Sequence, residues 1–174
     1  MILITFNIIN PERAYKNVGA FNEKQLLEIT IQNTKAILRS LESKEILGTF
    51  FIEISLVSQL EKLIKKIINE GHEISFYNID STLEEIDSLK KNTEALIGKQ
   101  IRGIRIKENA FDLSELHRLR FTYVSLIEDT ALIFPFKRFE RKAPFREHNG
   151  LSILHGSISR YSQFALYDLV FQLL

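Results

Sequence analysis

Four histidines and no cysteine limit the metal and acid–base chemistry that this sequence could perform. His72 has no second histidine at a spacing that would complete a metal site, so a structural role is predicted for it. His117 is expected to be solvated on a short helix, and His148 to lie in a polar loop. His155 comes at the end of a predicted strand and is the best histidine candidate for a site residue.

Other polar residues have a structural explanation beside a functional one. Asn7 and Asn10 follow the first apolar run, where they could bind a sugar hydroxyl or satisfy loop backbone. Asp80 is best explained as part of the capping segment of the next helix. Residues 136–146 mix basic and aromatic side chains, a pattern also found where proteins bind nucleic acid or an anionic glycan. A solvated loop with buried aromatics is favoured there.

Composition indicates an ordinary globular protein. The 174 residues are 45% hydrophobic and 26% charged, and are expected to form one domain over residues 1–174. The net charge of +1 predicts no nucleic-acid partner. No apolar run approaches the roughly 20 residues of a membrane span, and the N-terminus lacks the basic region of a signal peptide. A cytoplasmic protein without a membrane span is therefore expected.

Apolar runs alternate with helical patterns along the chain, which predicts parallel strands with helices outside them. Asn22 is the expected cap of the first helix, and Gly98 is expected to end a later one. Strands are predicted at residues 2–6, 46–53, 74–77, 101–106, 121–124 and 151–158. Helices are predicted at 22–43, 56–68, 82–97, 112–120 and 161–174. Residues 7–21 and 126–149 are predicted to be loops.

Four blocks in order resemble one enzyme family. Ile4-Thr-Phe-Asn7 resembles a first strand that ends T-F-D, and residues 33–51 resemble a helix leading into A-T-F-F. Residues 67–74 match the segment I-x-x-x-G-H-E-I, and residues 93–105 resemble L-E-x-I-T-G-x-x-x-x-G-F-R. The sequence thus resembles the NodB-type polysaccharide deacetylases (carbohydrate esterase family four). The resemblance implies an α/β fold, a deformed (β/α) barrel of mostly parallel strands with outer helices. Because the chain is short at its C-terminal end compared with the family, an incomplete barrel is the alternative expectation.

That resemblance also implies a divalent metal such as zinc, held by an aspartate and two histidines, with a second aspartate as general base. In this sequence Asn7 stands at the position of the base, and Asn10 is the last of the three positions after it where the family carries acidic residues. Tyr77 and Ser81 stand at the positions of the two histidines. Arg105 is retained, but the proline two residues later is Lys107. An amide is not basic at neutral pH, and these side chains bring no negative charge to a metal. No catalytic residues, metal or other cofactor are expected.

Three functions remain open. The favoured one is a catalytically inactive deacetylase-like protein that binds carbohydrate or a partner protein. Its binding residues would be Asn7, Asn10, Tyr77, Arg105 and His155. The alternative is a divergent metal-dependent hydrolase of carbon–nitrogen bonds other than peptide bonds, which would deacetylate an N-acetylated sugar using His155 and Asp80. The third is an interaction module in which a homodimer replaces the missing strands.

Overall fold

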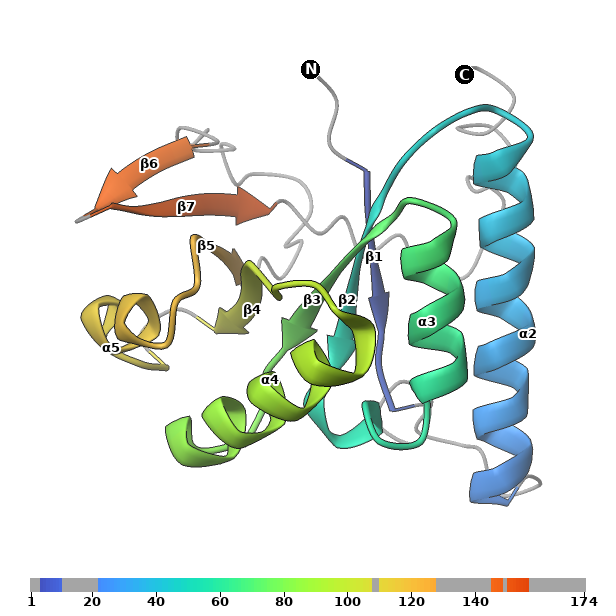
Figure 1. Ribbon diagram of the computed structural model, residues 1–174, viewed down its shortest axis with the longest axis horizontal. Coiled ribbons are helices and arrows are strands. Elements are labelled where there is room, and N and C mark those ends of the chain that lie inside the picture. The colour runs from blue at the N-terminus through green and yellow to red at the C-terminus, as the bar shows by residue number, and fades with distance from the viewer. Residues whose placement is uncertain (1–3, 11–21, 108–109, 128–144, 149, 157–174) are drawn as a thin grey trace, which may run out of the picture.

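The computed structural model describes residues 4–10, 22–107, 110–127, 145–148 and 150–156, and within them one sheet is flanked by helices (Figure 1). The strands are β1 (Thr5–Ile8), β2 (Thr49–Glu53), β3 (Glu73–Tyr77), β4 (Gly103–Lys107), β5 (Tyr123–Ile127), β6 (Phe145–His148) and β7 (Leu151–Gly156). The helices are α2 (Glu23–Glu42), α3 (Glu61–Asn69), α4 (Leu83–Ile97) and α5 (Leu113–Arg118), with a 3₁₀ turn at Ile54–Leu56.

The sheet order is β1-β2-β3-β4-β5-β7-β6. The first six strands in that order are parallel, and β6 is antiparallel to β7. The alternation of strands and helices therefore gives parallel strands, as predicted, because each connecting helix returns the chain to the same end of the sheet. Within the described residues the sheet is open between β1 and β6, and its strands and outer helices match the predicted α/β class.

Local capping chemistry fixes the helix ends. The side chains of Asn22 and Gln25 form a reciprocal capping box at the start of α2, and Thr82 and Glu85 do the same for α4. At the end of α4, Gly98 adopts the left-handed conformation with φ 67°. The predicted starts of these two helices and the stop at Gly98 are confirmed.

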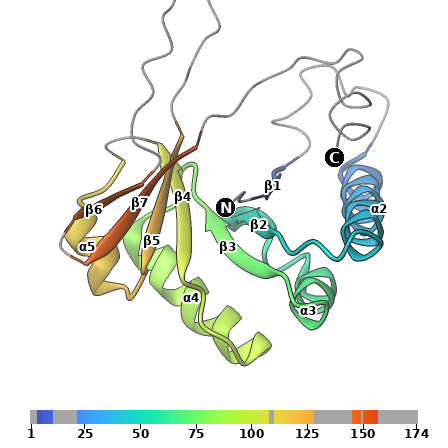
Figure 2. The same cartoon turned by 90° about the horizontal axis from the view of Figure 1, so that it is seen from above.

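Strand alternation gives the sheet two different faces. One face packs against the helices, which Figure 2 shows grouped on one side of the sheet. This is the hydrophobic core, where buried residues such as Phe50, Ile52, Phe76 and Ile104 meet Ile64 and Ile86 of the helices. The opposite face we term the polar face; it comprises Thr5, Asn7, Thr49, Phe51, Glu53, Glu73, Ser75, Tyr77, Gly103, Arg105, Lys107, Tyr123 and Ser125.

Several element predictions need correction. β1 extends to Ile8, so Asn7 is a strand residue rather than the first residue of a loop. α3 begins at Glu61 and not at Leu56, because the 3₁₀ turn intervenes. His148 was expected in a polar loop but belongs to β6, which pairs with β7 across a turn containing Gly150. The predicted helix 161–174 and most of the loops 7–21 and 126–149 lie outside the described residues.

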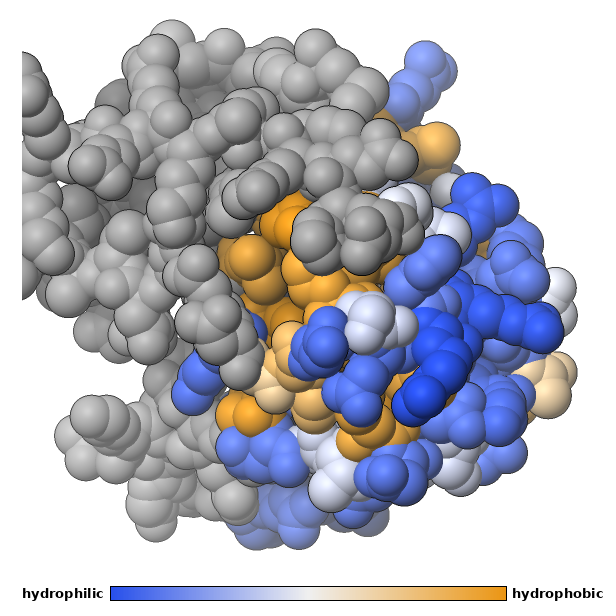
Figure 3. All heavy atoms as spheres, turned by 90° about the vertical axis from the view of Figure 1, so that its left-hand side faces the viewer, coloured by the Kyte–Doolittle hydropathy of each residue, from blue (hydrophilic) through white to orange (hydrophobic). Residues whose placement is uncertain are grey.

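No helix in the described part of the chain is both long and apolar enough to cross a membrane. Figure 3 shows hydrophilic residues over much of the described surface on its side of the molecule, with hydrophobic residues gathered near the centre.

His72 has the structural role predicted for it. Its ring is 4% exposed and packs edge-on against Phe50, and its Nδ1 accepts a hydrogen bond of 3.2 Å from the Gly48 N–H. Because Nδ1 must be unprotonated to accept this bond, the neutral ring is the form that fits. Burial lowers the pKa of His72 below its ordinary value, with Glu70 opposing the shift.

His72 should therefore make folding stability depend on pH. Below about pH 6.5 the unfolded chain binds a proton that the native ring resists, so the free energy of unfolding should fall by up to about 1.4 kcal/mol per pH unit. Urea unfolding between pH 7.5 and 5 measures this. His72→Gln should flatten the profile, whereas His117→Gln, at an exposed position on α5, should leave it unchanged. An unaltered slope in His72→Gln would contradict this explanation.

Candidate functional site

Arg105 is the centre of the polar face. It lies in β4, is 5% exposed, and donates three hydrogen bonds to side chains of two other strands. Its Nε donates to Ser125 Oγ at 3.0 Å, its Nη2 to Thr5 Oγ1 at 3.2 Å, and its Nη1 to Asn7 Oδ1. The guanidinium carbon lies 3.7 Å from the centre of the Phe51 ring, a cation–π stacking distance.

This side chain crosses the sheet. Arg105 is in β4, while Thr5 and Asn7 are in β1, and both β2 and β3 lie between them. At a strand spacing of about 4.8 Å, β1 and β4 are roughly 14 Å apart along the sheet. The guanidinium therefore reaches β1 by lying over β3 and β2, and the ring of Phe51 in β2 supports it. Arg105 thus links strands that are not neighbours.

The charge of Arg105 has only neutral partners among the described residues, namely two hydroxyls and one amide oxygen. Burial lowers the pKa of Arg105 to about 10 because removal from water disfavours the cation. That value is still well above neutral pH, so the guanidinium keeps its charge. The polar face therefore holds a buried cation whose described hydrogen-bond partners carry no negative charge.

Asn7 is exposed, and the structure brings it into contact with Arg105. Its amide oxygen accepts from Nη1, so the part of the side chain that resembles a carboxylate already faces a cation. An amide oxygen does not take up a proton at neutral pH. The Asn7–Arg105 pair consequently has the geometry of a base held by an arginine without the basicity.

The other residues proposed from the sequence are spread over different surroundings. Tyr77 is half-buried and occupies the same register row as Arg105. The backbone N–H of Asn10 donates to the buried carboxylate of Glu53 at 2.6 Å, which ties the segment after β1 to the end of β2. His155 lies in β7, where register pairs it with Leu126 rather than with the Ser125 row of Arg105.

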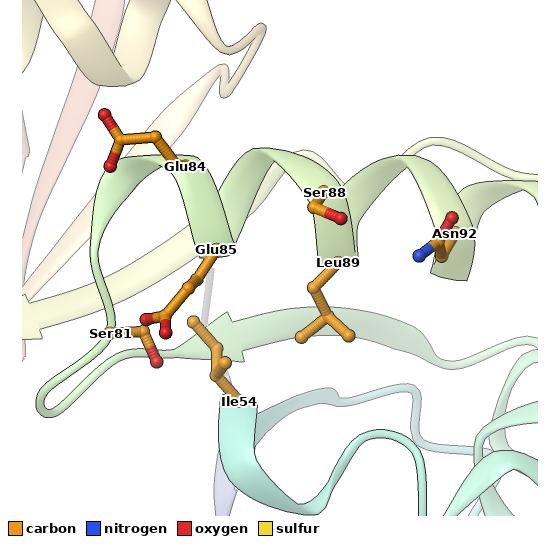
Figure 4. Close-up of a pocket in the computed structure, with 7 residues that line it drawn as sticks. All are labelled: Ile54, Ser81, Glu84, Glu85, Ser88, Leu89 and Asn92. Carbon is orange, nitrogen blue, oxygen red and sulfur yellow. The ribbon is translucent and has the colours of Figure 1, made fainter.

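Ser81 lies against the helix layer. It lines a depression of about 500 Å³ between α4 and the 3₁₀ turn, together with Ile54, Glu84, Glu85, Ser88, Leu89 and Asn92. Figure 4 shows Ser81, Glu85 and Ile54 close together at one end of this depression, with Leu89 directed into the same space. The loop that carries Ser81 is held by Asn78, whose side-chain amide bonds to the Ser81 N–H and carbonyl at 3.0 and 3.2 Å.

Sequence reasoning missed the residues that support Arg105. Phe51 is buried outside the main core, and Tyr123 meets its ring edge-on. The Tyr123 hydroxyl shares a hydrogen bond with Ser75 of β3, so its ring lies over Gly103 of β4. A Cβ atom at Gly103 would be only 2.0 Å from Tyr123 Cζ. The available signal was alternation, since serine, glycine and arginine interrupt otherwise apolar strands at every second position.

Burial also acts on Tyr123. It raises the pKa of the phenol above its ordinary value, and the hydrogen bond to Ser75 only partly opposes this. The hydroxyl therefore stays protonated and neutral, and Tyr123 serves as a hydrogen-bonding brace between β5 and β3. Its ring fills the space that Gly103 leaves open.

The described residues do not fit a divalent metal. None of the His, Asp and Glu side chains in the described ranges form a group of three that could hold one. The oxygen of Asn7 is bonded to Arg105, and Ser81 lines the depression beside α4. Arg105 and Lys107 add positive charge on the same face of β4, which would repel a cation further. A metal-bound water is therefore not part of the chemistry derived for this site.

Comparisons with solved structures identify the fold. A candidate polysaccharide deacetylase from Mycobacterium smegmatis superposes with a TM-score of 0.52 and 19% identity over 71% of this chain and 49% of its own. The chain has the fold of the polysaccharide deacetylases. A second solved structure is a mutant of the CE4 family pseudoenzyme BA3943 in which enzymatic activity is restored. It superposes with a TM-score of 0.50 and 14% identity over 71% of this chain and 43% of its own. BA3943 comes from Bacillus anthracis.

The resemblance found in the sequence is thus confirmed at the level of the fold. No protein-family model matches the sequence, and no curated protein is significantly similar to it. The chain spans less than half the length of each of these two solved structures. At these identities the likeness shows the deacetylase-like fold.

The contact between Gly103 and Tyr123 predicts a specific coupling. Gly103→Ala should destabilise the protein by about 1–3 kcal/mol, because the new methyl group displaces the Tyr123 ring from Ser75. In a Tyr123→Ala background the same substitution should cost little, since the ring is gone. Urea unfolding of the four proteins in a double-mutant cycle measures this coupling. An equal cost in both backgrounds would show that the strain arises elsewhere.

Proposed function

We propose that this chain is a catalytically inactive, polysaccharide-deacetylase-like domain that binds carbohydrate. The observation that carries the proposal is the Asn7–Arg105 pair, in which an amide occupies the base position and its oxygen is already bonded to the arginine. Hydrolysis of an amide requires a group that accepts the proton of the attacking water. Asn7 cannot do so at neutral pH, and the described donors do not suit a metal.

Binding is proposed at the carboxyl ends of the parallel strands. Ligands of open α/β sheets bind outside these ends, where the loops begin. Asn7 lies near the carboxyl end of β1, Tyr77 ends β3 and Lys107 ends β4. Asn7 and Lys107 are exposed and Tyr77 is half-buried. An amide, a phenol and an ammonium are hydrogen-bonding groups that suit the hydroxyl and carbonyl oxygens of a sugar.

Chito-oligosaccharides test the proposal directly. Titration of acetylated chitotetraose, followed by calorimetry and by amide NMR shifts, is expected to give saturable binding. Asn7→Ala should weaken binding by about tenfold, because the hydrogen bond proposed between the Asn7 amide and the sugar is lost. Lys91→Ala, on the exposed side of α4, is the control and should bind as the unmodified chain does.

Acetate release from the same oligosaccharide distinguishes a catalytically inactive protein from a divergent hydrolase. No release is expected, with or without added zinc, nickel or cobalt. Metal-dependent release that survives Asn7→Ala would support a divergent hydrolase with a relocated base and would overturn the proposal of inactivity. Absence of saturable binding of acetylated chitotetraose would overturn the proposal that the chain binds an acetylated glycan.

A further inference from the structure

Two cations project from the same face of β4. Arg105 and Lys107 are separated by one residue, so strand alternation places both on the polar face. Arg105 is buried, whereas Lys107 is exposed at the carboxyl end of the strand. Asn7 is the exposed member of the Arg105 cluster. The accessible end of this cluster therefore consists of an amide and an ammonium beside a buried guanidinium.

The guanidinium has hydrogen-bonding capacity to spare. It carries five N–H donors, and its three hydrogen bonds within the described residues go to Ser125, Thr5 and Asn7. Neutral acceptors offset only part of the cost of removing a charge from water. A carboxylate would offset more of it, because the charged bond is stronger and can be bidentate.

The neighbouring carboxylates of the polar face are engaged elsewhere. Glu53 accepts from the Asn10 N–H at 2.6 Å and from the Ser55 hydroxyl at 2.8 Å. Glu73 accepts from Thr49 Oγ1 at 2.8 Å, near the amino ends of the strands. Neither is bonded to Arg105. The two charged side chains that β4 itself contributes to this face, Arg105 and Lys107, are therefore both cations without a bonded carboxylate among the described residues.

We propose that Arg105, Lys107 and Asn7 form a binding site for the carboxylate of an acidic sugar, a uronic acid. Lys107 attracts the anion at the surface, Asn7 offers its side-chain N–H₂ group, and Arg105 offers the N–H groups that its three hydrogen bonds leave unused. The assignment to a sugar rests on the proposed function, whereas the carboxylate site rests on the contacts of Arg105 alone. A ligand of this class differs from a neutral acetylated glycan by one negative charge.

The thermal midpoint of the purified chain measures the response to three solutes, acetate, glucuronate and glucose, with ionic strength kept constant by chloride. Acetate tests the carboxylate alone, and glucose tests the sugar ring without charge. We expect glucuronate to raise the thermal midpoint more than acetate does, and glucose to leave it unchanged. Equal midpoints in chloride, acetate and glucuronate would overturn the site, as would an equal response to glucose and glucuronate. A response to acetate that glucuronate does not exceed would overturn the assignment to a sugar acid.

Variants locate the response. Asn7→Asp places a carboxylate against Arg105, so it should raise the midpoint without ligand and weaken glucuronate binding by about tenfold or more, measured by calorimetry. Lys107→Gln, at an exposed position, should fold normally and weaken binding by about threefold. The matched control is Lys91→Gln, a lysine on the outer side of α4 that is paired with Asp87. Unchanged glucuronate binding in both Asn7→Asp and Lys107→Gln would place the anion elsewhere.

The anion site and the proposed function can fail separately. Glucuronate binding that Lys107→Gln weakens, without binding of neutral chitotetraose, would support the anion site and reject an acetylated glycan as ligand. Chitotetraose binding without any effect of glucuronate would reject the anion site and keep the proposed function.

Discussion

The polar face depends on one side chain that crosses it. Arg105 starts in β4, passes over β3 and β2, and bonds to β1, so the two ends of a four-strand span share one guanidinium. Parallel strands are otherwise joined only to their neighbours by backbone hydrogen bonds. A crossing of this kind restricts what can lie beneath it. Phe51 provides a flat surface for the cation, and Ser75 keeps the residue of β3 small.

The same constraint explains why this face differs from the core face. Along β1 to β5 the core-facing positions are branched or aromatic hydrocarbons, which fit against amphipathic helices. On the polar face, large and small residues must alternate between strands so that Arg105 and Tyr123 can lie across it. Gly103 is the clearest case, since the ring of Tyr123 occupies the place of its missing side chain. Packing on this face therefore depends on a few long-range contacts and less on general hydrophobicity.

The sequence was sufficient for the order of elements and for most helix ends, because caps and apolar periods are local signals. It did not predict β6, whose four residues carry no alternating pattern and which is defined by pairing with β7. The roles of Ser125 and Thr5 as partners of Arg105 were also missed, because these contacts join residues 20 and 100 positions apart. Asn7 and Arg105 were identified through the family resemblance, and the fold shows the contact between them.

The substitution at position 7 has two effects with one physical origin. In the family pattern this position is an aspartate, whose shape asparagine reproduces closely. The oxygen of Asn7 still accepts from Arg105, so the crossing geometry is kept. What changes is the charge, because the amide neither accepts a proton nor neutralises a guanidinium. The amide at position 7 therefore accounts for two features at once, a side chain that takes up no proton at neutral pH and a guanidinium whose described hydrogen-bond partners are neutral.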